Sequence, residues 1–543
     1  MTPHALSQEL VAYVHARLER VISRFFPDLR FAGYFAGHRI GPAETAEALT
    51  LLAGLRGRGI DRIAGYAADE ALRVVLGRVD GAETRMFSSY RIAEVLLTAG
   101  AFAGNPLLAE LGDAQRDAVR RAVDPKMFDA VKRTIIPKAN NYWLVLARCE
   151  YARERLGLAE DPSILALALE RSRQELFRAT SGFFDDSRPR YGRFDLYSYD
   201  VQLFAEPFRH LLGVAETDRT MLAHVRLLES LALENGAAVA WGRSVGANSV
   251  LVTLELAALA LQRGLAADPA RMLGLAENAF RAFDGWIDDD LISAHRGRMT
   301  DGYRGPHRLV EMTLDCLIKV LHAAGRLAEV APVVACADRK RLFPAVDDLT
   351  RFDGPGAGVW MYRDRDLAFQ LPFVRGYNSD YLAHPRFPGV FEVPVDSAMA
   401  CGVPRLAMGT TEFTCSGVPA AITKAPRGIT ATWDAFTALD DEDVSARFAG
   451  ARTVRYEVRD GAIAVDEDWS FDAVPDLVSL QIPESAARLR IAMRCQPAPR
   501  AAIVTTDGIA PWRSFWGPLT RVHQFDFVPA RRIAFSYTLS RDA

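Results

Sequence analysis

Apolar residues in the first part of the chain recur at the spacing of a helix. Between residues 6 and 26 they return every three or four positions, and Pro27 ends the run. Similar patterns, joined by short connections and with no strand signal before residue 340, predict further helices at 42–56, 61–75, 88–103, 113–123, 126–135, 139–157, 162–180, 199–213, 217–235, 247–264, 268–286 and 307–325. Paired helices of this length commonly close into a toroid or stack as a solenoid. Because no fixed-period repeat is visible, we favour the closed (α/α) toroid.

The pattern changes to short strand-like runs after about residue 335. Runs such as GVWMYR (358–363) and AIAVDEDWSF (462–471) are separated by Gly and Pro. Short strands with turn signals between them are typical of an antiparallel sandwich. We therefore predict a multidomain α and β protein, with a catalytic (α/α) toroid of the (α/α)6 kind over 1–335 and an antiparallel β-sandwich over 336–543.

Composition excludes some classes of function. The chain is 50% hydrophobic and 24% charged, which is ordinary for a globular protein, and its net charge of −3 argues against a general nucleic-acid binder. The six cysteines show no CxxC pair and no zinc-ligand spacing, so we expect buried thiols. Charged residues interrupt the first apolar run, and no window reaches about 18 apolar residues. We expect a cytoplasmic protein without a signal peptide or membrane span.

Residues 181–210 form a polar, aromatic interruption between helical patterns. Aromatic faces stack on sugar rings, and carboxylates or phenols move protons, so the stretch predicts a sugar site. The alternative is a surface loop whose aromatics cover the core and whose acids are solvated. We select Asp195, Tyr199 and Asp200 as candidate catalytic residues, and Asp186 and Tyr197 as candidate binding residues.

Two flanking clusters carry further candidates for binding. Asn140 at a helix start suits a cap, but a second Asn followed by Tyr-Trp also suits a sugar, through amide hydrogen bonds and stacking. A Trp-Gly-Arg-Ser run at 241–244 precedes an apolar helix, and its Arg either binds a carboxylate with two hydrogen bonds or ties two loops together. The candidate binding residues from these clusters are Asn140, Asn141, Trp143, Trp241 and Arg243.

A basic, Gly-rich stretch at 295–307 precedes the last predicted helix. His307 with Tyr303 and Asp301 could form an acid–base group, whereas the alternative has His307 capping the helix or pairing with Glu311. We add Tyr303 and His307 to the catalytic candidates. A Tyr-rich loop at 375–381 could reach over the mouth of the toroid, although an exposed turn is favoured there.

The order of these motifs resembles a known group of proteins. NN-x-W, GFF-x-D, D-x-Y-x-Y and GRS follow one another within about residues 138–262. They resemble a poorly characterised bacterial family related to carbohydrate enzymes with a toroid and a β-sandwich, such as heparinase II/III-type and oligoalginate lyases and helical-toroid glucuronidases. The related sequences have His-Pro where this chain has Glu206-Pro207, so no role of that His is carried over. The resemblance implies an enzyme acting on a uronate-containing glycan and leaves the reaction open.

Three functions fit these residues. Hydrolysis, slightly preferred, needs an acid and usually a second carboxylate, which the central stretch supplies, with Arg243 holding a uronate. β-Elimination needs the uronate charge neutralised, by the paired asparagines and Arg243, while Tyr199, Tyr303 or His307 moves protons. A glycan-binding protein without catalysis is the third. Neither reaction requires a metal or cofactor, the expected partner is an acidic oligo- or polysaccharide, and a homo-oligomer is left open.

Overall fold

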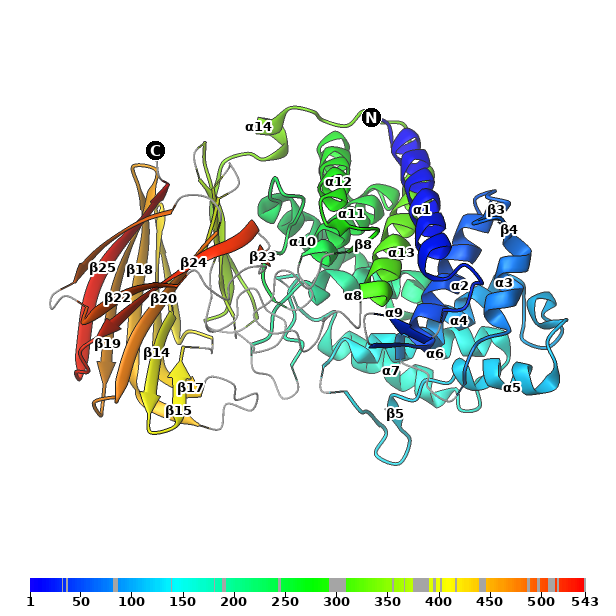
Figure 1. Ribbon diagram of the computed structural model, residues 1–543, viewed down its shortest axis with the longest axis horizontal. Coiled ribbons are helices and arrows are strands. Elements are labelled where there is room, and N and C mark those ends of the chain that lie inside the picture. Colours follow the sequence, from blue (N-terminus) through cyan, green and yellow to red (C-terminus); the bar gives the residue numbers. More distant parts are fainter. Residues whose placement is uncertain are drawn as a thin grey trace.

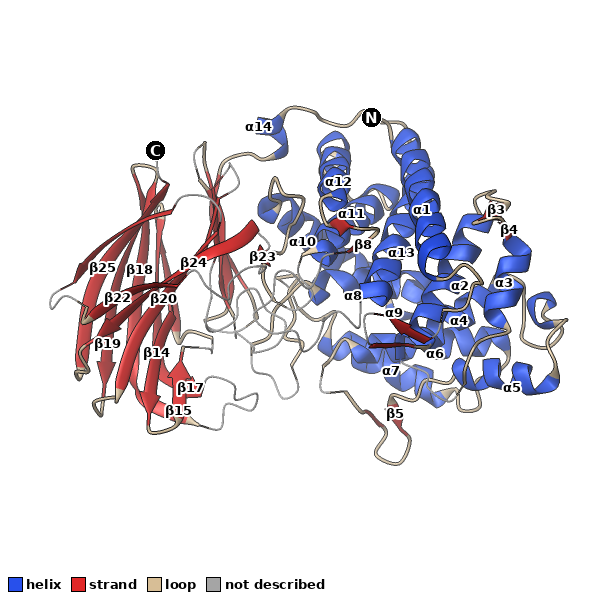
Figure 2. Cartoon of the chain, viewed as in Figure 1, coloured by secondary structure: helices blue, strands red, loops and turns tan. Residues whose placement is uncertain are grey.

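The computed structural model contains a helical region followed by an antiparallel β region, and the two lie side by side (Figures 1 and 2). The structure describes the chain except for residues 32, 36–37, 82–85, 138, 180, 188–191, 243–245, 293–308, 354–355, 366, 375–389, 394–396, 401–402, 416–417, 439–445, 486–488, 496–498, 506–512, 515–516 and 542–543.

Helices make up most of the first region. They are α1 (Pro3–Phe25), α2 (Pro42–Arg56), α3 (Ala68–Leu76), α4 (Met86–Leu97), η1 (Pro106–Leu108), α5 (Asp113–Ala122), α6 (Tyr142–Leu156), α7 (Ser163–Glu175), α8 (Tyr197–Ala205), η2 (Glu206–Phe208), α9 (Arg209–Leu212), α10 (Val214–Leu231), α11 (Ala247–Gln262), α12 (Pro269–Asp284) and α13 (Leu309–Ala328). A short helix, α14 (Arg339–Leu342), precedes the first strand of the β region.

Six of the described helices form a closed inner ring. In the order α2, α4, α6, α8, α11 and α13 each helix packs against the next, and α13 packs back against α2. The helices α1, α3, α5, α7, α10 and α12 each pack against a member of this ring from outside. The predicted (α/α) toroid is therefore confirmed, and the ring places one face of six helices around a common centre.

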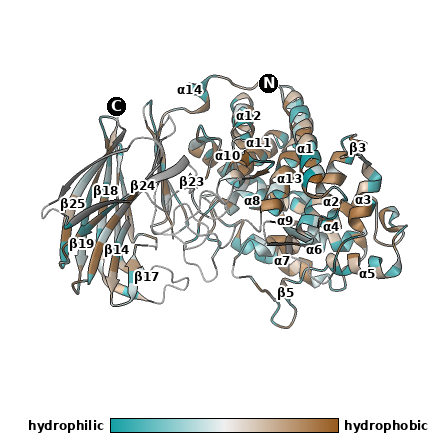
Figure 3. Cartoon of the chain, viewed as in Figure 1, coloured by the Kyte–Doolittle hydropathy of each residue, from teal (hydrophilic) through white to brown (hydrophobic). Residues whose placement is uncertain are grey.

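The sequences of individual helices explain their places in the toroid. On α1 the buried residues Leu6, Leu10, Val14 and Leu18 repeat every four positions and make one apolar face. By contrast, α11 buries nearly all of its residues because it packs against ring neighbours and against α12. Hydrophobic and hydrophilic residues interleave along the outer helices (Figure 3). No helix in the described part of the chain reaches the length and apolarity of a membrane span.

Short hairpins interrupt the helical region, so the prediction that no strand precedes residue 340 is wrong. They pair β1 (Gly33–Phe35) with β2 (His38–Ile40), β3 (Arg62–Ile63) with β4 (Tyr66–Ala67), β5 (Phe128–Asp129) with β6 (Thr134–Ile135), and β7 (Ile287–Asp288) with β8 (Leu291–Ile292). The helix predicted at 126–135 is one of these hairpins, and the helix predicted from residue 61 begins only at Ala68. Positive φ angles at Ala64 and Arg133 mark the tight turns that replace helix.

The strands of the second region pair only in antiparallel fashion where the structure describes them. They are β9 (Val346–Arg351), β10 (Gly358–Arg363), β11 (Ala368–Phe373), β12 (Val390–Val393), β13 (Ser397–Ala400), β14 (Val403–Met408), β15 (Thr411–Thr414), β16 (Ala421–Ala425), β17 (Gly428–Ala438), β18 (Arg447–Arg459), β19 (Ala462–Phe471), β20 (Leu477–Ser485), β21 (Leu489–Cys495), β22 (Ala501–Thr505), β23 (Arg513–Ser514), β24 (Gly517–Phe527) and β25 (Arg532–Arg541).

Two layers of these strands face each other across an apolar core, as expected for a sandwich. One layer runs β16–β17–β18–β19–β25–β21, and the other contains β14, β20, β24 and β22. β15 joins the layers because it pairs with both β14 and β17. The large buried aromatic residues Trp360, Phe369, Trp469 and Tyr537 belong to the core of this region.

The first strands of the β region are bound to the toroid. Phe352 stacks on Phe183 of the central stretch, with 4.5 Å between ring centroids. The side-chain amide of Gln370 on β11 donates to the carbonyls of Leu231, at 2.6 Å, and Ala238, at 2.8 Å. These contacts fix the connection between α10 and α11, and with it the N-terminal end of α11.

Candidate functional site

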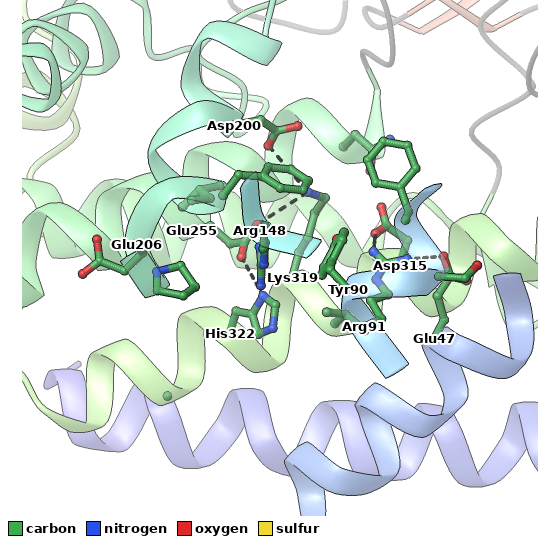
Figure 4. A pocket seen from close by; sticks show the side chains of 18 of the residues that line it. Glu47, Tyr90, Arg91, Arg148, Asp200, Glu206, Glu255, Asp315, Lys319 and His322 are labelled. Atoms are coloured by element: carbon green, nitrogen blue, oxygen red, sulfur yellow. Dashed lines mark hydrogen bonds and ion pairs between the residues drawn. The ribbon is translucent and has the colours of Figure 1, made fainter. Parts of the chain in front are cut away.

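The inner ring encloses a cavity of about 670 Å³ (Figure 4). Many of its lining side chains are charged or aromatic, and every inner helix contributes to the lining. The charged side chains include Glu47 from α2, Arg91 from α4, Arg148 from α6, Asp200 from α8, Glu255 from α11 and Lys319 from α13. Because these residues are far apart in the sequence, the closing of the ring creates the site.

Lys319 lies between two carboxylates in the cavity. Its Nζ is 3.6 Å from Oδ1 of Asp200 and 3.6 Å from Oε2 of Glu255 (Figure 4). The side chains of Asp200 and Glu255 are only 9% and 2% exposed. In such a dry setting the ammonium group is the main partner that keeps either carboxylate charged.

This arrangement moves the pKa values of the two carboxyl groups apart. Burial raises the pKa of Asp200 to about 6, against the opposing attraction of Lys319. Burial acts on Glu255 in the same sense, but Lys319, His322 and Arg326 outweigh it and hold the pKa of Glu255 below its usual value. Asp200 can therefore carry a proton near neutral pH while Glu255 remains charged, which is how carboxyl groups divide acid and base roles.

His322 contacts the other oxygen of Glu255. Its Nδ1 lies 3.3 Å from Oε1 of Glu255, and Arg326 Nη1 donates to the same oxygen at 3.3 Å. The His322 side chain is 39% exposed, and its partial burial lowers the pKa of the imidazole, although the hydrogen bond to Glu255 acts in the opposite sense. The imidazole is therefore neutral at pH 7.

Paired arginines build another part of the cavity wall. Arg91 donates to Glu47 at 2.7 Å, and Arg148 makes two hydrogen bonds to Glu94, at 2.6 and 2.9 Å. The guanidinium carbon of Arg148 lies 4.4 Å from the ring centroid of Tyr90, and that of Arg91 lies 5.7 Å from it. Each of these cations has a carboxylate partner, so they shape the wall and hold the tyrosine in place.

Aromatic side chains also line the cavity. The ring of Phe87 lies 5.9 Å from that of Tyr142 and 6.2 Å from that of Phe204, and Tyr90 lies 5.8 Å from Phe204, measured between centroids. Phe204 follows Asp200 by one turn of α8, so the two share a face of the helix. The cavity thus offers apolar surface for a sugar ring beside a group that can hold a proton.

Two of the predicted residues, Asp200 and Tyr197, line the cavity. Tyr199 does not: it packs on Phe183, with 5.6 Å between ring centroids, and its buried hydroxyl has no hydrogen-bond partner among the described residues. Burial raises its pKa well above the usual value, which makes the phenol a poor base. Consecutive helical residues point about 100° apart, so Tyr199 and Asp200 cannot both face the ring centre.

The predicted asparagines tie the central stretch to α6. The side chain of Asn140 donates to the carbonyls of Asp185, at 3.1 Å, and Ser187, at 3.2 Å. The backbone N–H of Asn141 donates to Oδ1 of Asp186 at 2.7 Å. Asn140, Asn141 and Asp186 are all buried, and none of them lines the cavity. These contacts hold the loop and explain Asn140 and Asp186 without a ligand. Asn141 takes part through its backbone N–H, and its buried side-chain oxygen has no hydrogen-bond partner among the described residues.

The remaining described candidates are also structural in their contacts. Oδ1 of Asp195 accepts from the backbone N–H of Tyr197 at 3.1 Å, where α8 begins. The indole N–H of Trp241 donates to the carbonyl of Phe194 at 2.8 Å, and both Trp241 and Trp143 are buried in apolar clusters. The structure therefore places these three away from the cavity. The candidates that lie outside the described residues are Arg243, Tyr303, His307 and the loop at 375–381.

A stripe of polar residues on α13 is missing from the sequence prediction. They recur three or four residues apart in an otherwise apolar helix: Glu311, Asp315, Lys319, His322 and Arg326. That spacing puts all of them on one helix face. A buried helix with a charged face is a readable sign of a polar interior, and it points directly at the cavity.

No family model matches the chain, and no curated protein matches it. Among solved structures it is similar to the chondroitin AC lyase of Streptomyces coelicolor A3 in complex with chondroitin sulphate, at 12% identity, with 98% of this chain and 79% of that chain covered and a TM-score of 0.46. A heparinase III structure shows 11% identity, coverage of 93% and 84%, and a TM-score of 0.30. A heparan sulfate lyase from Pedobacter heparinus shows 9% identity, coverage of 99% and 88%, and a TM-score of 0.24.

These solved structures are named as a chondroitin AC lyase, a heparinase III and a heparan sulfate lyase, whereas the motif order resembles both lyases and glucuronidases. At such low identity, and with TM-scores of 0.46 or less, the likeness carries no argument about this chain, so the role of each residue has to follow from the cavity. The helical toroid and the antiparallel β region that the resemblance implies are present in the structure itself, in the packing of the helices and the pairing of the strands.

Proposed function

We propose that the protein is an enzyme that cleaves a uronate-containing glycan by β-elimination. The observation that carries the proposal is the group at the cavity centre, where Lys319 lies 3.6 Å from both Asp200 and Glu255. A glycan lyase needs a cation for the uronate carboxylate, an acid for the leaving oxygen and a base for the C5 proton. Lys319 and Asp200 supply the first two.

The charge of this group favours an acidic sugar when Asp200 is protonated. Protonation removes the negative charge of Asp200 from beside Lys319, which still lies 3.6 Å from Glu255 and is also attracted by Asp315. A uronate carboxylate can take the place beside Lys319 that the charge of Asp200 leaves. The same carboxylate also favours the protonated form of Asp200, because two like charges repel in a dry cavity. Substrate binding and protonation of the acid therefore support each other.

The reaction then follows from the positions of these groups. Pairing of the uronate carboxylate with Lys319 makes the C5 proton more acidic, because the negative charge that develops on loss of the proton is stabilised. Removal of that proton forms the C4–C5 double bond as the bond from C4 to the leaving oxygen breaks. Asp200 gives its proton to that oxygen.

Hydrolysis is the second candidate, since Asp200 and Glu255 are a carboxyl pair with separated pKa values. Glu255 is poorly suited to activate water, however. Its side chain is almost fully covered, Oε1 is occupied by His322 and Arg326, and Oε2 faces Lys319. A carboxylate with a lowered pKa is also a weak base. The cavity thus favours elimination, whereas the sequence slightly favoured hydrolysis.

The proposal is tested by incubating the protein with a panel of polyuronates and glycosaminoglycans. Elimination creates a C4–C5 double bond that absorbs in the ultraviolet, and we expect this absorbance with at least one member. The Lys319→Met variant should lose about 100-fold or more in rate. The control variant Lys340→Met, at an exposed position on α14, should retain the wild-type rate. New reducing ends without absorbance would mean hydrolysis, and binding without product would mean a glycan-binding protein.

A further inference from the structure

The base that elimination requires has to reach a ligand in the cavity. Among the titratable side chains around Lys319, His322 is the most accessible, at 39% exposure, compared with 14% for Lys319 and 13% for Arg326. Figure 4 shows it on α13, the helix that also carries Lys319. A substrate in the cavity therefore meets His322 more readily than either carboxylate.

Glu255 fixes the direction in which His322 can act. Because Oε1 of Glu255 lies 3.3 Å from Nδ1, the proton of the neutral imidazole is held on Nδ1. The lone pair is then on Nε2, at the far side of the ring. Glu255 is itself fixed by Arg326 and Lys319, so the imidazole is held by a rigid anchor.

The surroundings keep the imidazole neutral before the reaction and tolerate its charge afterwards. The charged groups around its part of the cavity come from the turn after α2 and from α6, α11 and α13, and they are Arg58, Arg148, Glu255, Lys319 and Arg326. Burial and the nearby arginines disfavour a resting imidazolium. Once a proton is taken up, Glu255 is the carboxylate in direct contact with the new cation.

We propose that His322 is the catalytic base and that Glu255 is its positioning residue. Nε2 of His322 takes the C5 proton of the uronate, the electrons of the C5–H bond form the C4–C5 double bond, and the C4–O bond breaks. The leaving oxygen takes its proton from Asp200. His322 then returns its proton to water and Asp200 regains one, so no other reactant is needed. This inference rests on the proposed function and assigns the base within the same cavity.

His322→Gln removes the base and leaves an uncharged amide of similar size in its place. On a substrate that the wild type cleaves, we expect about a 100-fold or greater loss in kcat, a KM within a few-fold of wild type and an unchanged unfolding temperature. The control His210→Gln, at an exposed position on α9, should behave as wild type. Added imidazole should restore part of the rate of His322→Ala, because the shortened side chain opens space for it in the cavity.

The pH profile separates a base from a structural residue. Wild-type kcat/KM should fall at low pH as His322 takes up a proton, and Glu255→Gln should move this fall to lower pH because the carboxylate that favours the imidazolium is gone. A His322→Gln variant with wild-type kcat and an unchanged acid limb would overturn the assignment and leave the proposed function standing. Failure of the wild type to form any double bond across the panel would overturn both.

Discussion

The raised pKa of Asp200 has a consequence for stability that can be measured without a substrate. Burial lifts this pKa from its usual 3.8 to about 6. Since the folded pKa lies above the unfolded one, folding favours the protonated form. The stability that this provides is complete below about pH 4 and is lost as the pH rises through about 6. A shift of this size corresponds to about 3 kcal/mol of unfolding free energy.

The Asp200→Asn variant isolates this effect because its amide has a similar shape and does not titrate. We would follow unfolding of both proteins by circular dichroism in denaturant at several pH values between 4 and 7.5. The variant's stability relative to wild type should rise by about 3 kcal/mol as the pH increases from 4 to 7, and then level off. The attraction of Lys319 acts on the ionised carboxylate and is already contained in the pKa of about 6, so only the difference between the protonated carboxyl and the amide shifts all points equally. A difference that stays flat over this range would refute a buried, proton-holding Asp200.

Two further predictions concern packing outside the cavity. Glu467→Gln breaks an ion pair with Arg452 that is buried inside the β region. The variant should lower the unfolding free energy by about 3–5 kcal/mol in denaturant titrations. A loss below about 1 kcal/mol would show that the pair is solvated. Gly242→Ala should lower the unfolding temperature more than Gly264→Ala. Both glycines have positive φ angles, but a Cβ at position 242 would overlap Asp195 whereas position 264 is open, so equal losses would contradict the packing described for this turn.

The fold was largely readable from the sequence because its signals are local and repeated. Apolar residues at helical spacing predict the helices, and their pairing predicts the ring that the structure contains. The hairpins were missed because their strands are only two or three residues long and depend on tight turns, as at Ala64 and Arg133.

The candidate site was only partly readable, for a physical reason. Motif reading favours clusters that are close in sequence, and most of the described residues in those clusters hold the central stretch in place through contacts such as those of Asn140 and Trp241. Asp200 and Tyr197 reach the cavity because α8 turns that face inward. Lys319 was not predicted because it contacts Asp200 only after the ring closes. Its place in the polar stripe of α13 is the local sequence signal that marks it.

The stoichiometry of cleavage tests the proposed chemistry of the cavity most directly. Double bonds, measured by ultraviolet absorbance, and new reducing ends would be counted in the same reaction on a uronate glycan. We expect one double bond for every new reducing end with the wild type, and neither product above background with Lys319→Met. Reducing ends without double bonds, or full activity in Lys319→Met, would contradict elimination in the cavity of the helical ring.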